Sequence, residues 1–162
     1  MKRSRKRKSV LSQYQQGYIH CLCNVIRLGC KKVSDDLDDL LMGEVDSTEE
    51  ELCKAIEKIA PQYGVRVYVD HYTDYITTKG SVTVIRPDGS RQELGPGKHK
   101  YETFSLILYK REEDLERLLA LLKSSKKDKN YHRKMGELYG YGAEEIEAFV
   151  REDFSEAKPK RR

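Results

Sequence analysis

The sequence predicts an α+β protein with N-terminal helices, a central antiparallel meander of three to four strands, and C-terminal helices. Apolar residues recur at helical spacing up to about residue 60 and again from about residue 111, and they alternate with polar residues in between. Turn residues such as Pro87-Asp88-Gly89 separate the alternating segments. Helices and strands therefore occur in separate blocks, which favours α+β over the alternating βαβ class.

The first block contains three predicted helices. A helix over residues 9–30 has an apolar stripe that consists of Ile19, Leu22, Cys23, Ile26 and Cys30. A short helix is expected over residues 35–42. A third helix spans residues 47 to about 60, where Ser47 is the predicted N-cap and Glu50 completes a capping box.

In the central block, apolar and polar residues alternate, which is the period of two that is typical of strands. Strands are predicted over residues 65–70 and 103–110, with a further short strand around residues 75–78. The stretch 81–94 contains the turn between two more strands. Residues 95–100, GPGKHK, are expected to form a hairpin connection, and a phosphate-contacting loop is the alternative.

The last block begins with a helix over residues 111–125. The stretch YHRKMGELYGYG, residues 131–142, is dense in aromatic, basic and glycine residues, and its spacing predicts a corner between two further helices. At 100° per residue, the buried stripe of the first of these consists of Tyr131, Met135 and Leu138. Gly140 fits the left-handed position that ends a helix, and Arg133 points toward solvent. The final helix is expected to bury Ile146, Phe149 and Val150.

Three residues of this corner are candidates for a ligand site. His132 and Tyr139 lie together on the edge of the buried stripe, and Tyr141 follows the turn. A small enzyme or ligand-binding protein would use them as the lining of a pocket. The packing of a helical corner also accounts for most of the stretch, so the pocket is an alternative rather than the favoured interpretation.

Residues 132–150, HRKMGELYGYGAEEIEAFV, resemble the signature R-x-x-G-x-L-x-G-Y-P-x-x-A-I-x-x-F of an uncharacterised, mainly archaeal family of small proteins. Gly142 stands where the signature has proline. The signature positions fall on Arg133, Gly136, Leu138, Gly140, Tyr141, Ile146 and Phe149. The resemblance implies an archaeal source and brings no known activity. The high content of Lys and Glu, and the excess of 11 Tyr over 3 Phe, suit a thermophile.

Charge is distributed unevenly along the chain. Residues 2–8 hold six Lys or Arg and residues 158–162 hold four, without an acidic residue in either stretch. The remaining 21 basic residues stand against 27 acidic ones, so residues 9–157 carry a net charge of −6 while the whole chain carries +4. Blocks of like charge stay solvated, and they suit phosphate backbones because each neutralised phosphate releases condensed counterions.

We therefore predict a cytoplasmic protein that binds nucleic acid, RNA in the first place, or a ribonucleoprotein, and that carries out no chemistry of its own. A protein-interaction or virion-type structural subunit is an alternative, and so is terminal charge that serves only solubility or localisation. The candidate phosphate contacts are Lys2, Arg3, Arg5, Lys6, Arg7, Lys8, Lys126, Lys127, Arg133, Lys134, Lys160, Arg161 and Arg162.

The same charge pattern sets the predicted boundaries: a basic arm over residues 1–8, one α+β domain over residues 9–152, and a basic tail over residues 153–162. No apolar run reaches the roughly 20 residues that span a bilayer. The segment after the basic start is also too polar for the core of a signal peptide, so no membrane partner is expected.

Several other groups contain chemically active residue types. His20, Cys21, Cys23 and Cys30 include metal-ligand types, but C-x-C-x6-C within a helical pattern is not the C-x2-C spacing of zinc sites. Core packing is favoured there, while a metal site, a disulfide or a reactive thiol stays open. Base stacking on the strand region is another alternative, and its candidates are Tyr68, Tyr72 and Tyr75 with His71 and Lys79. We recognise no catalytic set and no cofactor or metal motif, so an enzyme is not favoured.

Overall fold

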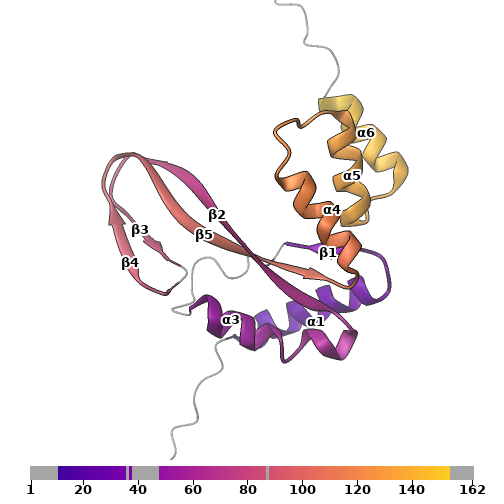
Figure 1. Cartoon of the computed structure of the whole chain (residues 1–162), viewed down its shortest axis with the longest axis horizontal. Coiled ribbons are helices and arrows are strands. Elements are labelled where there is room, and N and C mark those ends of the chain that lie inside the picture. Colours follow the sequence, from indigo (N-terminus) through magenta and orange to yellow (C-terminus); the bar gives the residue numbers. More distant parts are fainter. Residues whose placement is uncertain (1–10, 36, 38–47, 87, 154–162) are drawn as a thin grey trace, which may run out of the picture.

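The computed structural model describes residues 11–35, 37, 48–86 and 88–153, and it confirms the α+β class (Figure 1). Among the described residues, the helices that precede the long strands are α1 (Gln13–Arg27), α3 (Glu49–Ile56) and the 3-10 helix η1 (Ala60–Tyr63). Three helices follow the strands: α4 (Glu112–Leu122), α5 (Lys129–Tyr139) and α6 (Ala143–Asp153). The basic arms, Ser47 and most of the predicted helix over residues 35–42 lie outside the described residues.

The main sheet is built around one long antiparallel ribbon. Strands β2 (Arg66–Thr78) and β5 (Gly97–Tyr109) pair along their whole lengths, with Arg66 opposite Tyr109 and Thr78 opposite Gly97. The two-residue strand β1 (Val33–Ser34) pairs with the last residues of β5, which gives the strand order β1-β5-β2.

A second hairpin is inserted between the two long strands. Its strands β3 (Val82–Ile85) and β4 (Arg91–Leu94) pair with each other as a separate two-stranded sheet. The pairing is antiparallel throughout, as predicted, but the hairpins are nested rather than paired in succession. The predicted strands over residues 65–70 and 75–78 are one strand. Residues 97–100, predicted as a loop, extend β5 because β2 offers backbone partners opposite them.

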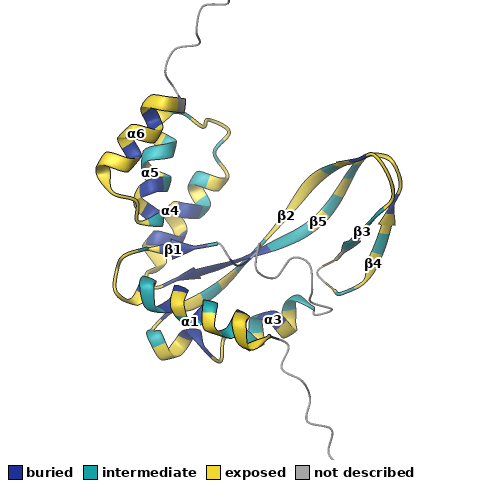
Figure 2. Cartoon of the chain, turned by 180° about the vertical axis from the view of Figure 1, so that it is seen from behind, coloured by how far each residue is buried: buried dark blue, intermediate teal, exposed yellow. Residues whose placement is uncertain are grey.

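Each face of the ribbon covers its own hydrophobic core, because successive side chains of a strand point to opposite faces. Leu106 and Leu108 belong to a first core that is completed mainly by α1, α3 and η1. Ile107 and Tyr109 belong to a second core with Val33 of β1 and apolar residues of α4 and α5. The buried end of the ribbon therefore lies between two helical layers (Figure 2).

The start of α3 differs by one residue from the prediction. Thr48 is the N-cap: its Oγ1 accepts a hydrogen bond from the Glu51 amide at 3.3 Å, and Glu51 Oε2 accepts one from the Thr48 amide at 3.1 Å. The capping box is therefore shifted from Ser47 and Glu50 to the next pair of the same residue types, which satisfies the same kind of unpaired amides. Such a cap contributes about 1 kcal/mol.

Candidate functional site

Helix α5 ends in a left-handed turn that leads directly into α6. Gly140 has a φ angle of +80°, and the Tyr141 amide donates to the Gly136 carbonyl oxygen at 3.0 Å, which is the closing bond of a Schellman motif. The Gly142 amide donates to Glu145 Oε2 at 2.8 Å and satisfies one unpaired amide at the start of α6. The predicted corner between two helices is therefore confirmed.

Two glycines of the corner permit close packing. A Cβ atom on Gly140 would lie 1.8 Å from the carbonyl oxygen of Cys30, so the turn rests directly on the backbone that follows α1. The Lys32 amide reinforces this contact by donating to the Leu138 carbonyl oxygen at 2.9 Å. A Cβ atom on Gly136 would lie 2.7 Å from Cγ1 of Ile146, so α5 and α6 approach closely at that point.

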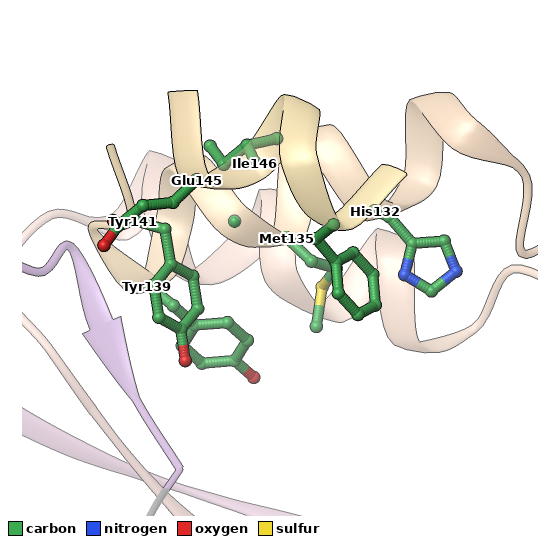
Figure 3. A pocket seen from close by; sticks show the side chains of 8 residues that line it. His132, Met135, Tyr139, Tyr141, Glu145 and Ile146 are labelled. Carbon is green, nitrogen blue, oxygen red and sulfur yellow. The ribbon is translucent and has the colours of Figure 1, made fainter. Parts of the chain in front are cut away.

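A groove of about 470 Å³ lies between α5 and α6 (Figure 3). His132, Tyr139 and Tyr141, the three candidates from the sequence, all line it. Figure 3 shows the two tyrosines at one end, Met135 in the middle and His132 at the other end. The sequence prediction missed the remaining lining residues, which are Met135, Gly136, Glu145, Ile146 and Phe149.

Phe149 is 48% exposed, so the prediction that it is buried is wrong. Helix α6 is an outer helix of the molecule (Figure 1), and its fully buried stripe is limited to Ile146 and Val150. Tyr141 at the other side of the groove is 61% exposed. Two large aromatic side chains are therefore presented to solvent around a mainly apolar groove, which is the kind of surface that marks a binding site.

Ring contacts and one hydrogen bond hold the walls of the groove. The His132 ring lies 5.1 Å from the Tyr131 ring and 5.4 Å from the Phe149 ring, measured between centroids. At the other end, the Tyr139 hydroxyl donates to Asp35 Oδ2 at 2.8 Å. This bond ties α5 to the residue after β1 and fixes the hydroxyl of a residue that lines the groove.

Arg133 is engaged in a structural ion pair. Its Nε donates to Glu147 Oε1 at 2.6 Å and its terminal nitrogen donates to Glu147 Oε2 at 3.0 Å, which is a bidentate contact between α5 and α6. Hydrogen bonding to Glu147 raises the pKa of the Arg133 guanidinium, and hydrogen bonding to Arg133 lowers the pKa of Glu147. Arg133 therefore points toward a carboxylate of the same chain, which weakens the expectation that it contacts a phosphate.

The other basic candidates of the described region are solvent-exposed or nearly so. Lys126 Nζ lies 3.6 Å from Asp128 Oδ2, at a site where both side chains are well solvated. Lys127 Nζ lies 5.9 Å from the centroid of the Tyr131 ring, and Lys134 is exposed on α5. Lys126 and Lys127 therefore place positive charge at the start of α5, the end of the groove where His132 lies. The remaining candidates, Lys2, Arg3, Arg5, Lys6, Arg7, Lys8, Lys160, Arg161 and Arg162, lie outside the described residues.

The residues of the suggested metal cluster do not come together. Cys23 is buried in the first core, Cys21 and Cys30 are exposed, and His20 Nδ1 makes a 2.8 Å hydrogen bond with the Tyr63 hydroxyl. Within the described residues, no group of three or more His, Cys, Asp or Glu has a geometry suited to a metal ion. Of the interpretations weighed for Cys23, core packing fits its buried position in the first core.

Thiol modification should distinguish the four cysteines. Burial raises the pKa of Cys23 to about 11, and burial together with Glu49 and Glu57 raises the pKa of Cys53 to about 11. Because the thiolate is the reactive form, we expect Cys21 and Cys30 to react rapidly with a thiol reagent at pH 8. Cys23 and Cys53 should react about 100-fold more slowly or only on unfolding. Four equally fast thiols in the folded protein, counted by mass spectrometry, would contradict this assignment.

The tyrosines of the ribbon do not form one stacking platform. Tyr75 shares a face with Lys98, whose Nζ lies 5.2 Å from the centroid of its ring, whereas Tyr68 and Tyr72 point to the opposite face. His71 pairs with Glu49 at 2.7 Å. The segment that was weighed as a phosphate loop belongs to β5 from Gly97 onward, and His99 Nε2 makes a 2.7 Å hydrogen bond with the Gly95 carbonyl oxygen.

The comparisons with known proteins add no relative. Among the described residues, no helix combines the length and the apolar character that crossing a bilayer requires. The resemblance of residues 132–150 to an archaeal family stays a prediction. No family model, no curated protein and no solved structure matches the chain.

Proposed function

We propose that this chain is a cytoplasmic nucleic-acid-binding protein, with RNA as its first expected partner, that carries out no chemistry of its own. The observation that carries the proposal is the separation of charge. Residues 2–8 and 158–162 hold ten of the 31 basic residues, while residues 9–157 have a net charge of −6. A polyanion is drawn to such ends, because each phosphate that a Lys or Arg neutralises releases counterions.

The structure supports a role for two separate basic regions. Helix α1 lies close to the start of the described chain and α6 at its end, and these two helices lie on opposite sides of the β2–β5 ribbon (Figure 1). The two basic blocks are therefore attached to different helical layers. Lys126 and Lys127 precede α5 and Lys134 lies on it, all three are exposed, and α5 packs against α6, so they extend the proposed contact surface on this helical layer.

Deletion of residues 1–8 tests the proposal. We expect the shortened chain to bind a fluorescein-labelled RNA about 100-fold more weakly than the intact chain in fluorescence anisotropy at low salt, because six phosphate contacts are removed. As a matched control, the variant Lys98→Gln/Lys100→Gln removes two exposed lysines from the ribbon and should bind as the intact chain does. RNA and DNA affinities that are unchanged by the deletion would overturn the proposal.

Binding of a small ligand is the second candidate function. The observation in its favour is that His132, Tyr139 and Tyr141 line one groove of about 470 Å³, a volume within the range of ligand pockets. A screen of aromatic small molecules by thermal shift, with the variant Tyr141→Ala as a control, would test this function. It is supported by a compound that stabilises the intact chain and leaves the variant unchanged.

A further inference from the structure

We infer that the groove between α5 and α6 holds one unpaired base of a single-stranded nucleic acid, while lysines of the α4–α5 connection contact its phosphates. This inference rests on the proposed function, because it assigns to the same partner a second, base-reading contact. Three features of the described residues carry it: the shape of the groove, the rings that line it and the charge at one of its ends.

The shape of the groove depends on Gly136. A side chain at this position would project toward Ile146, as the 2.7 Å separation from a built Cβ atom shows. Because Gly136 has none, the two helices meet closely and Ile146 lines the groove beside it. The result is an elongated apolar recess along about two turns of α5, from His132 to Tyr139.

The rings that line the groove are suited to stacking. Four of its eight lining residues are His132, Tyr139, Tyr141 and Phe149, and the last two are 61% and 48% exposed. A base that enters the groove would meet rings at either end, Phe149 beside His132 at one end and the two tyrosines at the other. Stacking of this kind does not require a particular base, because every base has a π face.

The polar groups of the groove are few. Glu145 is the acidic residue of the lining, and its Oε2 already accepts a hydrogen bond from the Gly142 amide. The remaining lone pairs of its carboxylate can accept a hydrogen bond from the amino group of adenine, cytosine or guanine. We therefore expect these bases to be preferred over uracil in the groove.

Positive charge lies at the opposite end. Residues 123–128, which connect α4 to α5, hold three lysines and one acid, Asp128, and Lys129 begins α5. Lys127 Nζ lies 5.9 Å from the centroid of the Tyr131 ring, and the Tyr131 and His132 ring centroids are 5.1 Å apart. Tyr131 therefore lies between Lys127 and the groove-lining His132. The α6 side is acidic, and of its glutamates Glu147 is paired with Arg133. This asymmetry places the phosphates at the His132 end and the base within the groove.

The inference predicts that the chain binds single strands more tightly than duplexes. The bases of a duplex are stacked and paired, so their faces cannot enter the groove without an unstacking cost. The basic ends, in contrast, contact the phosphates of either form. A base-binding groove therefore predicts that the chain prefers single strands, and that this preference depends on the aromatic lining.

The experiment uses the intact chain and its variant Phe149→Leu, which keeps an apolar side chain and removes the ring. The probes are a single-stranded RNA of about ten nucleotides with one 2-aminopurine, the corresponding duplex, and adenosine monophosphate. We expect Phe149→Leu to weaken single-strand binding by about 5- to 100-fold and to leave duplex binding unchanged. The variant Phe149→Tyr keeps a ring and should restore the affinity.

Tyr14→Leu is the matched control, because Tyr14 is an exposed aromatic residue on α1 rather than on α5 or α6. It should bind single strands as the intact chain does. Circular dichroism melting of each variant separates a binding effect from unfolding. The fluorescence of 2-aminopurine should change on binding to the intact chain and to Tyr14→Leu, and should change less with Phe149→Leu.

Each other outcome has a distinct meaning. If the chain binds both forms with a strong salt dependence and Phe149→Leu has no effect, the groove assignment is overturned while the proposed function stands. If neither form binds, both are overturned. Adenosine monophosphate that binds as tightly as the strand would replace the inference with a mononucleotide site. A dimer that Phe149→Leu dissociates, without an effect on RNA, would replace it with a self-association surface.

Discussion

Replacement of Gly140 by alanine is expected to destabilise the folded protein by about 3 kcal/mol or more. Gly140 has a φ angle of +80°, which a residue with a side chain adopts only under strain. In addition, the new Cβ atom would lie 1.8 Å from the Cys30 carbonyl oxygen, and a backbone oxygen cannot move aside as a side chain can. Urea denaturation monitored by circular dichroism measures the change in the free energy of unfolding.

Gly29 supplies a matched control for this experiment. It has the same φ angle of +80°, but no heavy atom lies within 4 Å of a built Cβ atom. Gly29→Ala therefore tests the conformational strain alone and should cost about 1 kcal/mol. The difference between the two variants measures the contact of the α5–α6 corner with Cys30. Equal destabilisation by the two substitutions would show that the corner does not rest on that backbone.

Leu106→Ala and Ile107→Ala are each expected to lower the free energy of unfolding by about 2–5 kcal/mol. The two residues are neighbours in β5 and both are fully buried, yet they point to opposite faces of the ribbon. Leu106 belongs to the core beneath α1 and α3, whereas Ile107 belongs to the core shared with α4 and α5. Each truncation leaves a cavity in a different core.

Lys100→Ala on the same strand is the control, since Lys100 is exposed and its loss should change stability by less than about 0.5 kcal/mol. Chemical denaturation of the three variants provides the comparison. A large effect at Leu106 together with a small one at Ile107 would mean that the C-terminal helices do not pack on the sheet in solution. The two-sided arrangement described here would then be incorrect.

Local patterns in the sequence predicted the elements better than their pairing. The left-handed end at Gly140 and the stripe of Ile19, Leu22, Cys23 and Ile26 follow from glycine chemistry and side-chain spacing, and both are present. Cys30, which was predicted to belong to this stripe, is exposed, because α1 already ends at Arg27. The insertion of β3 and β4 between β2 and β5 depends on which distant backbone segments meet, which no local pattern specifies. Residues 95–100 illustrate this limit: their glycines and proline suggested a loop, and pairing with β2 makes residues 97–100 part of β5.

The sequence identified only part of the groove between α5 and α6. His132, Tyr139 and Tyr141 could be grouped from their positions around one helix and its turn. Phe149 could not be assigned to the groove, because its exposure depends on how many neighbours α6 has in the folded chain. The close packing at Gly136 could have been predicted from the sequence. A glycine in the middle of a helix costs about 1 kcal/mol relative to alanine, so a close contact is the usual reason for its presence.

The salt dependence of binding tests the central claim, that the basic ends provide the main attraction to nucleic acid. The measurement compares the intact chain with a full-length variant in which Lys2, Arg3, Arg5, Lys6, Arg7 and Lys8 are all replaced by glutamine, on one DNA duplex over a series of salt concentrations. We expect the slope of log affinity against log salt to be less negative by about 5 in the variant, because six phosphate contacts are lost. Equal slopes for the two chains would contradict the account and would place the attraction elsewhere.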